Sequence, residues 1–404
     1  MVHFGKLSDN SVTISSKHNS TTISYELPKE TSVFSFDKEG RLWTALMDNI
    51  SYRRGLNGNI VAKWNSGKEV LHRKWLKTDE LTQLLTTSHQ KISEILSDIQ
   101  VNNINFNPVL DQQTIADLDY LSKLDMAFYE AEETKYRSVY KPVGILPPDQ
   151  YISVVLQLTE GCSFNKCTFC SFYRDRPFRI KTLDEFEQHI INVKNFVGKG
   201  LSLRRTIFLG DANALVVPTK KLIPLMDIIH KHLDVSQLGG LFAFLDGFSG
   251  EKKTIDEYKS LRNLGMEKIY VGLESGSDSL LKFLNKPGSA NDALHAVHQI
   301  KMAGLSVGII ILLGAGGKRY QDGHIRDTID IINKMSLDAD DLIYFSELIE
   351  SEGLDYSLQA FSSNVEPLSA SERILQRQII ERELFFPGND SPHISTYDIR
   401  DFVY

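Results

Sequence analysis

Residues 158–176 read LTEGCSFNKCTFCSFYRDR and contain all three cysteines of this 404-residue chain. The cysteines, Cys162, Cys167 and Cys170, follow the spacing C-x4-C-x2-C. Unrelated free cysteines would be scattered along the chain, whereas three thiols on one short loop can converge on a single group. An odd, clustered set does not fit a disulfide framework. Soft thiolate ligands instead suit an iron–sulfur cluster or zinc.

Zinc and an iron–sulfur cluster differ in how many protein ligands they need. Structural zinc takes four, yet no histidine lies between His89 and His189, and Asp175 would be an unusual fourth ligand. A four-iron cluster held by three cysteines keeps one iron open for a substrate or cofactor. The spacing therefore favours an open cluster, with zinc as the alternative.

The chain around this loop alternates between apolar strands and amphipathic helices, which is typical of parallel β/α units. The expected strands are YISVVLQL (151–158), RTIFLG (205–210), GGLFAFLD (239–246), EKIYVGLE (267–274), LSVGIIILLG (305–314) and DDLIYFSEL (340–348). The expected helices cover about 183–197, 219–233, 253–264, 277–284, 290–303 and 324–336. We predict an α/β fold, a partial (β/α)6 barrel, with its chemistry at the carboxyl ends of the strands.

A smaller β-rich α+β domain is expected before the barrel, over residues 1–145. Alternating β-branched residues and the hairpin signal Asn57-Gly58 predict strands in the first 75 residues. Helices are expected at 77–99, with Thr78 or Asp79 as the cap, and at about 112–136. The proline-containing segment 140–150 reads as a linker, residues 146–365 as the barrel, and residues 366–404 as a helix (368–384) and a tail packing on the barrel.

The composition of the chain limits which classes of binding partner are expected. The formal net charge is −7 and no long basic run is present, which argues against nucleic acid or an anionic membrane as a partner. No stretch approaches the roughly 20 apolar residues of a membrane-spanning helix, and the first residues have no apolar core of a secretory signal. We expect a cytoplasmic protein that acts on a small molecule. The oligomeric state is left open.

The chain resembles the radical SAM superfamily over about 60% of its length, from Tyr151 to Tyr404. The strongest element is Thr168-Phe169-Cys170, an aromatic residue before the last cysteine, although the family's usual first gap is one residue shorter. The segments FLGDANAL (208–215), VGLESGSDSLLKFLNKPG (271–288) and VGIIILLGAGG (307–317) are similar to family motifs on successive strands. The second of these looks like the branch of coproporphyrinogen oxidase and the methylthiotransferases.

The resemblance implies that the three cysteines ligate three irons of a [4Fe-4S] cluster and that the fourth iron binds S-adenosylmethionine (SAM). It implies cofactor contacts by Phe169, Gly210, Asp211, Glu274, Ser275, Gly308, Ile309, Leu312 and Arg174. Asp211 would accept from the methionine ammonium, Glu274 and Ser275 would reach the ribose or the methionine carboxylate region, and the strand residues would lie under the adenine. It assigns no catalytic residue, and a donor such as flavodoxin or ferredoxin would supply the electron.

Each of these residues also has a structural interpretation. Asp211 could cap a helix, the turn Glu274–Gly276 could cap the helix at 277, and the residues of strand 305–314 could be ordinary core. The arginines of FYRDRPFR (172–179), Arg174 among them, could form a solvated face. Weaker predictions for the same end of the sheet are Gln157, Thr159, Asp246, Tyr344, Ser346 and Glu347.

The resemblance predicts reductive cleavage of SAM to a 5′-deoxyadenosyl radical that abstracts hydrogen from a small molecule. Three cysteines leave no thiolates for an auxiliary cluster, a methylated cysteine or a hydrogen-donating cysteine, which excludes the reactions of the family that need them. Aminocarboxypropyl transfer, RNA or protein modification, and a non-catalytic cluster- or haem-binding relative remain alternatives.

Overall fold

The computed structural model describes residues 1–7, 10–27, 30–67, 70–250, 252–350, 354–387 and 390–404. The chain forms two compact units. The first contains Met1–Pro142, Asn192–Arg205 and Arg400–Tyr404, and the second contains Val143–Ile191 and Thr206–Ile399. The sequence-based division at residues 145 and 365 cuts the chain into consecutive segments. The division by contacts instead assigns Asn192–Arg205 and Arg400–Tyr404 to the first unit.

The first unit is built on an antiparallel sheet of nine strands in the order β8-β7-β6-β5-β4-β3-β2-β1-β9. Its strands are β1 (Val2–Leu7), β2 (Asn10–Ser16), β3 (Ser20–Leu27), β4 (Glu30–Asp37), β5 (Leu42–Met47), β6 (Ile50–Arg54), β7 (Ile60–Ser66), β8 (Val70–Trp75) and β9 (Asn105–Asn107). The predicted hairpin joins β6 to β7, with Gly58 at a φ of 89°. Alternation of apolar and hydroxyl side chains in β2, β3 and β4 places one row of each of these strands in the core.

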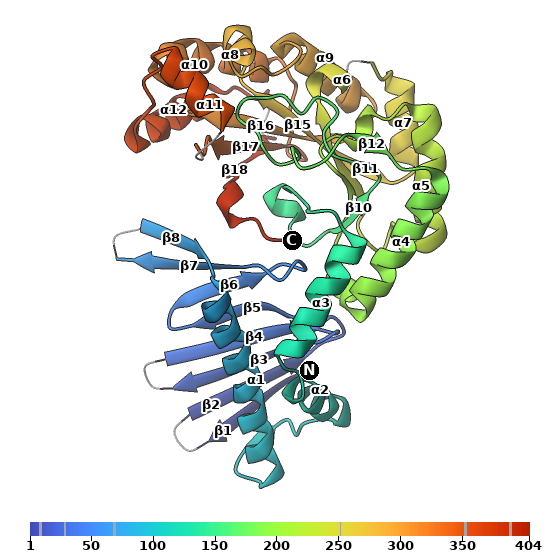
Figure 1. The fold of residues 1–404 in the computed structure, drawn as a ribbon, viewed down its shortest axis with the longest axis vertical. Helices are drawn as coiled ribbons and strands as arrows, with labels where there is room; N and C mark the ends of the chain where they lie inside the picture. The colour runs from blue at the N-terminus through green and yellow to red at the C-terminus, as the bar shows by residue number, and fades with distance from the viewer. Residues whose placement is uncertain (8–9, 28–29, 68–69, 251, 351–353, 388–389) are drawn as a thin grey trace. The chain divides into compact units, whose positions relative to one another are not determined.

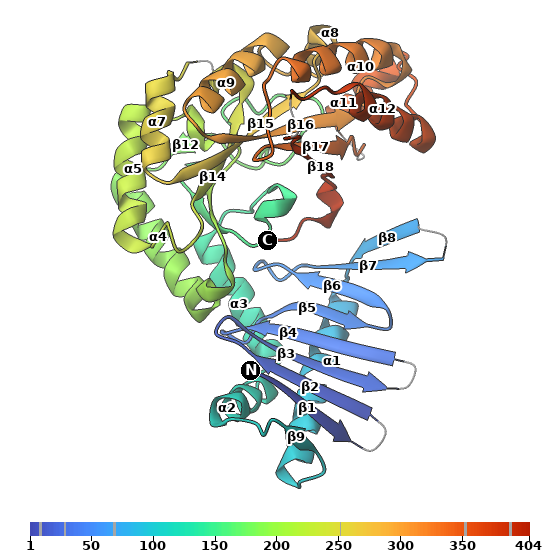
Figure 2. The ribbon, with the colours of Figure 1, turned by 180° about the vertical axis from the view of Figure 1, so that it is seen from behind.

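Three helices belong to this unit: α1 (Thr78–Gln100), α2 (Gln112–Ser122) and α3 (Met126–Val139). α1 lies across one face of the sheet (Figures 1 and 2) and packs its apolar stripe into the core. Two predictions were wrong. The cap of α1 is Lys77, whose backbone nitrogen donates to Glu80. The single helix expected at 112–136 is two helices, because the carboxylate of Asp125 starts α3 by accepting from Phe128 N.

The second unit confirms the predicted α/β fold. Its sheet has seven parallel strands in the order β10-β13-β14-β15-β16-β17-β18. They are β10 (Val154–Gln157), β13 (Ile207–Gly210), β14 (Leu241–Asp246), β15 (Met266–Glu274), β16 (Ser306–Leu313), β17 (Leu342–Glu347) and β18 (His393–Thr396). The first six were predicted. The tail adds β18, which pairs with β17, so the tail extends the sheet at its edge instead of only covering it.

The helices of this unit lie along one side of the curved sheet (Figures 1 and 2). They are α4 (Leu183–Val197), which runs into the first unit, α5 (Thr219–His232), α6 (Gly247–Gly250), α7 (Ile255–Asn263), α8 (Asp278–Phe283), α9 (Ala290–Met302), α10 (Gly317–Asn333), α11 (Asp355–Ser362) and α12 (Ala370–Glu383). α10 begins seven residues before its predicted start, because Gly314, Gly316 and Gly317 adopt positive φ and let the chain turn directly from β16 into the helix. α6 and α11 were not predicted.

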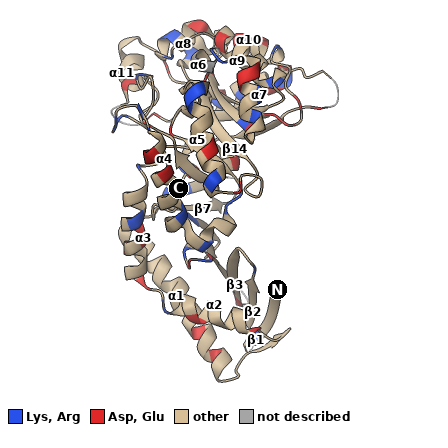
Figure 3. Cartoon of the chain, turned by 90° about the vertical axis from the view of Figure 1, so that its right-hand side faces the viewer, with Lys and Arg blue, Asp and Glu red and all other residues tan. Residues whose placement is uncertain are grey.

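The distribution of charged residues and the length and polarity of the helices can be compared with the expectations from composition. In the view of Figure 3, Lys and Arg are interspersed with Asp and Glu along the helices. Across the described ranges, every helix is too short or too polar to cross a lipid bilayer.

Candidate functional site

The cysteines lie on a loop that follows β10 and is closed at its base. There, the short strands β11 (Thr159–Glu160) and β12 (Arg179–Ile180) pair antiparallel. The Glu160 carboxylate accepts from Arg179 at 2.8 and 2.9 Å and from Lys181 at 2.8 Å. The hydrogen bonds from Arg179, the largest effect, together with Lys181, lower the pKa of Glu160 to about 2. The strand pairing and these ion pairs therefore close the 161–178 loop at its base.

Asp211, directly after β13, holds the inside of this loop. One oxygen accepts from Gln157 Nε2 at 2.8 Å, and the other accepts from Gly161 N at 2.9 Å and Arg176 Nε at 3.2 Å. Burial raises the pKa of Asp211, although the nearby Arg176 charge opposes the shift. The interpretation of Asp211 as a helix cap is wrong, since the next helical turn starts after Asn213. Its carboxylate joins two strand ends to the cysteine loop.

Further hydrogen bonds fix the tip of the loop. Thr168 N donates to Leu284 O, Tyr356 N donates to Thr168 O, both at 3.0 Å, and Asn285 Nδ2 donates to Lys166 O at 2.7 Å. These partners belong to the segment after α8 and to α11. The loop is thus anchored to segments more than 100 residues later in the chain.

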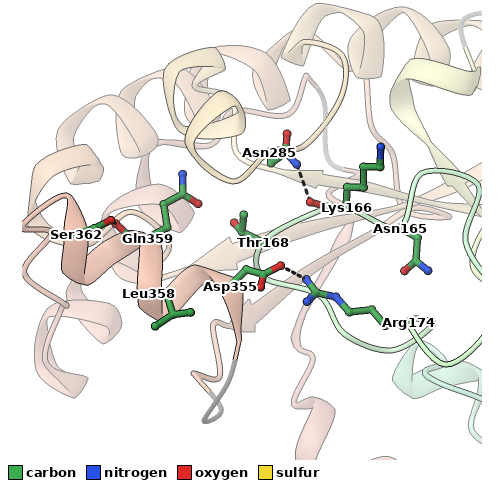
Figure 4. A pocket seen from close by; sticks show the side chains of 9 residues that line it. All are labelled: Asn165, Lys166, Thr168, Arg174, Asn285, Asp355, Leu358, Gln359 and Ser362. Carbon is green, nitrogen blue, oxygen red and sulfur yellow. Dashed lines mark hydrogen bonds and ion pairs between the residues drawn. The ribbon is translucent and has the colours of Figure 1, made fainter.

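A pocket of about 830 Å³ adjoins the cysteine loop, and its lining residues include Asn165, Lys166 and Arg174 but none of the cysteines. Figure 4 shows Arg174 in this pocket, pointing toward Asp355 at 2.7 Å. Its guanidinium also donates to the carbonyl oxygens of Cys167 and Cys170, each at 3.2 Å. Arg174 therefore stabilises the loop from outside, and its predicted contact with a cofactor is not supported by this placement.

The three thiols line one cavity of about 190 Å³, which we call the cysteine cavity. Among the residues predicted from the sequence, those that line it are Cys162, Cys167, Cys170, Phe169, Glu274 and Leu312, with Asp246, Ser346 and Glu347 of the weaker set. They come from the cysteine loop and from the carboxyl ends of β14, β15, β16 and β17. The parallel sheet brings these ends to one edge, as expected.

Three charged side chains meet in this cavity. The ammonium of Lys286 lies 3.3 Å from Glu274 Oε1, and both residues line the cavity with Asp246. Burial raises the pKa of Glu274 and of Asp246, with Lys286 opposing the shift in each case. Burial lowers the pKa of Lys286, but the charges of Glu274, Asp246 and Cys167 outweigh this effect and raise the pKa. The cavity therefore keeps one cation beside two carboxyl groups.

The three thiols share one cavity. In the part of the chain that the structure describes, no three His, Cys, Asp or Glu side chains come close enough together to hold one metal ion. The cavity lining contains no histidine and no fourth cysteine. Burial raises the pKa of Cys167 to about 12 and that of Cys170 to about 11, and Lys286 opposes both shifts. A bound cluster would displace these protons.

The remaining predicted residues are not among those that line the cavity. Ser275 is fully buried, and its hydroxyl accepts from Ser277 N at 3.0 Å and contacts His324 Nδ1 at 2.7 Å. Gly308 and Ile309 are core residues of β16, and a side chain at Gly308 would meet the Tyr270 ring at 2.4 Å. Gly210 pairs with Gln157 at the end of β13. Contacts of these residues with a cofactor stay predictions.

Sequence reasoning did not single out Lys286 or Tyr173, which line the cavity, and it named Tyr397 only as a tail residue that could contact a substrate. Lys286 belongs to the quoted motif 271–288, but only the turn after α8 brings it back to Glu274. Tyr397 follows β18, which the sequence did not predict. The signal for it is that Tyr397 is one of three aromatic residues, with Phe402 and Tyr404, in an otherwise polar tail that could supply substrate contacts.

Comparison with family models gives one match, which starts in β10 and ends in α10. Residues 156–332 match the model of the radical SAM superfamily, from β10 to the end of α10. No curated protein matches the chain in sequence.

Solved structures show weak likeness. The cobalamin-dependent SAM radical enzyme OxsB, with aqua-cobalamin and SAM bound, has 15% identity and a TM-score of 0.39, covering 57% of this chain and 31% of its own. Methylornithine synthase has 14% identity and a TM-score of 0.41, covering 58% and 64%. Coproporphyrinogen III oxidase from Escherichia coli has 14% identity and a TM-score of 0.43, covering 64% and 56%. The chain thus spans less than two thirds of each, and we draw nothing about substrate from them.

Proposed function

Because residues 156–332 match the model of the radical SAM superfamily, we propose that this chain is a radical SAM enzyme that cleaves SAM reductively and abstracts a hydrogen atom from a small-molecule substrate. The cofactors of such a domain are a [4Fe-4S] cluster and SAM. When bound, they supply one electron to the sulfonium and release a 5′-deoxyadenosyl radical. The observation that carries the proposal is the convergence of all three thiols on one cavity.

The cavity suits these cofactors in its ligands and in its charges. Cys162, Cys167 and Cys170 would ligate three irons, and the absence of a further thiol or imidazole from the lining leaves the fourth iron open to SAM. Lys286 provides a cation for a carboxylate, and Glu274 provides an acceptor for ammonium or ribose hydroxyl groups. Phe169 and Leu312 supply an apolar wall for the adenine and exclude water.

Asp211 is proposed to position the cluster loop, because its carboxylate is already shared among Gln157, Gly161 and Arg176. The substrate would enter on the side of Ser346 and Glu347 at the end of β17. A one-electron donor such as flavodoxin or ferredoxin would reduce the cluster.

The test is anaerobic reconstitution with iron and sulfide, followed by reduction with and without SAM. We expect four irons in each chain, an electron paramagnetic resonance (EPR) signal that changes on addition of SAM, and formation of 5′-deoxyadenosine. Cys167→Ala should lose the signal and the product. Ser171→Ala, an exposed change in the same loop, is the matched control and should keep both.

Two other outcomes would contradict the proposal. Stoichiometric zinc without SAM cleavage would make the cysteines structural. Methylthioadenosine in place of 5′-deoxyadenosine would point to aminocarboxypropyl transfer.

A further inference from the structure

The charged residues that line the cysteine cavity lie toward the middle of the sheet. Asp246 and Glu274 end β14 and β15, and Lys286, which follows α8, contacts Glu274. The strands continue from β15 through β16 and β17 to β18, which is the edge of the sheet. Because neighbouring strands lie about 4.8 Å apart, about 10 Å separates the end of β15 from the end of β17. The cavity lining therefore extends well beyond its charged groups.

Toward the edge of the sheet, the cavity is lined by aromatic and aliphatic side chains. Tyr173 of the cysteine loop lies near Tyr397, which follows β18: burial raises the pKa of Tyr397 well above its ordinary value, and nearby phenols, that of Tyr173 among them, add to the shift. The neighbouring lining residues come from the end of the cysteine loop and from the segments after β17 and β18. We call this part the apolar wall, and its members are Phe172, Tyr173, Leu348, Ile349, Tyr397 and Ile399.

The described lining contains one further charged residue, Glu347, which belongs to the other face of the sheet. Glu347 pairs in register with Leu313, whereas its neighbour Ser346 pairs with Leu312. Successive side chains of a strand point to opposite faces, and Leu312 and Ser346 line the cavity whereas Leu313 does not. Oε2 of Glu347 instead lies 3.7 Å from Nε of Arg373 on α12. The Glu347 carboxylate is therefore directed toward the helix layer and away from the apolar wall.

The three arginines that follow the cysteines are bound elsewhere. Arg174, Arg176 and Arg179 each form an ion pair with a carboxylate, and none of them is among the described residues that line the cavity. The positions of this unit outside the described ranges, 251, 351–353 and 388–389, carry no Lys, Arg or His. Lys286 is thus the single Lys or Arg of the described lining, and Glu274 holds it. A substrate anion at the apolar wall would therefore meet no cation.

Two neutral hydroxyl groups remain for hydrogen bonding to a substrate. The hydroxyls of Ser346 and Tyr173 have no hydrogen-bond partner among the described residues, and both keep accessible surface, whereas the phenol oxygen of Tyr397 is sealed. Ser346 and Tyr173 line the cavity and are only 5% and 4% exposed, so this accessible surface lies in the cavity. The part of the cavity beside the apolar wall thus offers apolar contact and uncharged hydrogen-bonding groups.

We propose that the substrate is an uncharged, largely apolar molecule with a hydroxyl, carbonyl or amide group, which Ser346 and Tyr173 bind. This inference rests on the proposed function, in which Glu274 and Lys286 serve SAM. An apolar group gains from burial against the apolar wall. A carboxylate, phosphate or ammonium group there would lose its hydration without gaining a partner of opposite charge. The cavity therefore selects against charged substrates.

The test uses three probes that share a phenylpropyl skeleton and differ in charge: 3-phenyl-1-propanol, 3-phenylpropionate and 3-phenylpropylamine. Anaerobic isothermal titration calorimetry measures their affinities for reconstituted, unreduced protein saturated with SAM. We expect the alcohol to bind at least about tenfold more tightly than either ion. Ser346→Ala and Tyr173→Phe should each weaken binding of the alcohol about three- to tenfold, because each removes one hydrogen bond to it. Ser171→Ala, an exposed change in the cysteine loop, is the matched control and should leave this affinity unchanged.

Tighter binding of either ion, equal affinities of the three probes, or no measurable binding of the alcohol would overturn the inference. Formation of 5′-deoxyadenosine by the same preparation after reduction tests the proposed function separately. If this product forms and the alcohol is not preferred, the substrate class alone is wrong. Absence of 5′-deoxyadenosine would contradict the proposed function and the inference with it. Thermal melting of the cofactor-free variants checks their folding independently of binding.

Discussion

The ammonium nitrogen of Lys286 lies 3.3 Å from Oε1 of Glu274, and both side chains line the cavity of the three thiols. The two residues are twelve positions apart and close across the turn after α8. Charges buried this deeply are stable only as partners, because removal of one leaves the other desolvated and unpaired.

Lys286→Met should therefore destabilise the second unit by about 3 kcal/mol. Adding Glu274→Gln should recover at least about 1 kcal/mol, because the uncompensated carboxylate is then gone. Hydrogen exchange of the β15 and β16 amides in the cofactor-free protein measures both. The three tryptophans, Trp43, Trp64 and Trp75, all lie in the first unit, so their fluorescence is an internal control. Equal stability of single and double variants would contradict the pairing.

Asp211→Asn should loosen the cysteine loop. The substitution removes a charged acceptor of Gly161 N and Arg176, and we expect a loss of about 2 kcal/mol and faster loss of iron from reconstituted protein. Urea unfolding and the rate of iron release to a chelator measure the two effects. Asp184→Asn, an exposed change in the first turn of α4, should cost less than about 0.5 kcal/mol. Unchanged iron release in Asp211→Asn would rule out the positioning role.

His324 should make stability depend on pH. Burial lowers its pKa to about 4, whereas the ordinary value is about 6.5. Between these values the unfolded chain binds a proton that the folded protein does not, so stability falls as the pH drops from about 6.5 to about 4, by about 3 kcal/mol. His324→Asn removes the titrating group and keeps an atom near Ser275. The free energy of unfolding of the variant should therefore fall less between pH 6.5 and 4, by about 3 kcal/mol. Urea unfolding across this pH range measures it, and identical pH dependence in the variant and the unsubstituted protein would exclude His324 as the cause.

Gly276→Ala and Gly323→Ala should have opposite effects. A Cβ at Gly276 would lie 2.2 Å from Asp327 O, a backbone atom, so we expect a loss of about 1–3 kcal/mol. A Cβ at Gly323, within α10, would meet nothing closer than Ser277 Oγ at 3.5 Å. Alanine there should stabilise the helix by up to about 1 kcal/mol. Thermal melting of both variants measures these effects. An unchanged melting temperature in Gly276→Ala would contradict the close packing of α10 against the turn that follows β15.

Tyr397→Phe should leave the cofactor-free protein as stable as before or more stable, by up to about 1 kcal/mol, because it removes a buried hydroxyl without a partner. Tyr344→Phe is the matched contrast. It breaks the hydrogen bond to Asp149 and should cost about 1–2 kcal/mol. Urea unfolding distinguishes the two, and a clear loss in Tyr397→Phe would show that its hydroxyl has a structural task.

Local patterns predicted much of the fold. Val154–Leu156, Ile207–Gly210 and Val307–Leu313 are continuous apolar runs within β10, β13 and β16, as expected of strands buried on both faces. The β18 strand was missed because HIST has only one strongly apolar residue and forms a strand by pairing with β17 at the sheet edge. α11 was missed because its segment, DYSLQAFS, carries no clear start signal.

The sequence by itself determined the cysteine loop, the six apolar strands and the meeting of their carboxyl ends, because spacing and periodicity are properties of neighbours along the chain. Only the tertiary structure decided that Lys286 returns to Glu274, that Asp211 serves the loop, and that Arg174 lies outside it. It also decided that Tyr397 lines the same cavity as the thiols. These relationships join residues far apart in the chain, and burial and pairing across the sheet set which side chains share a cavity.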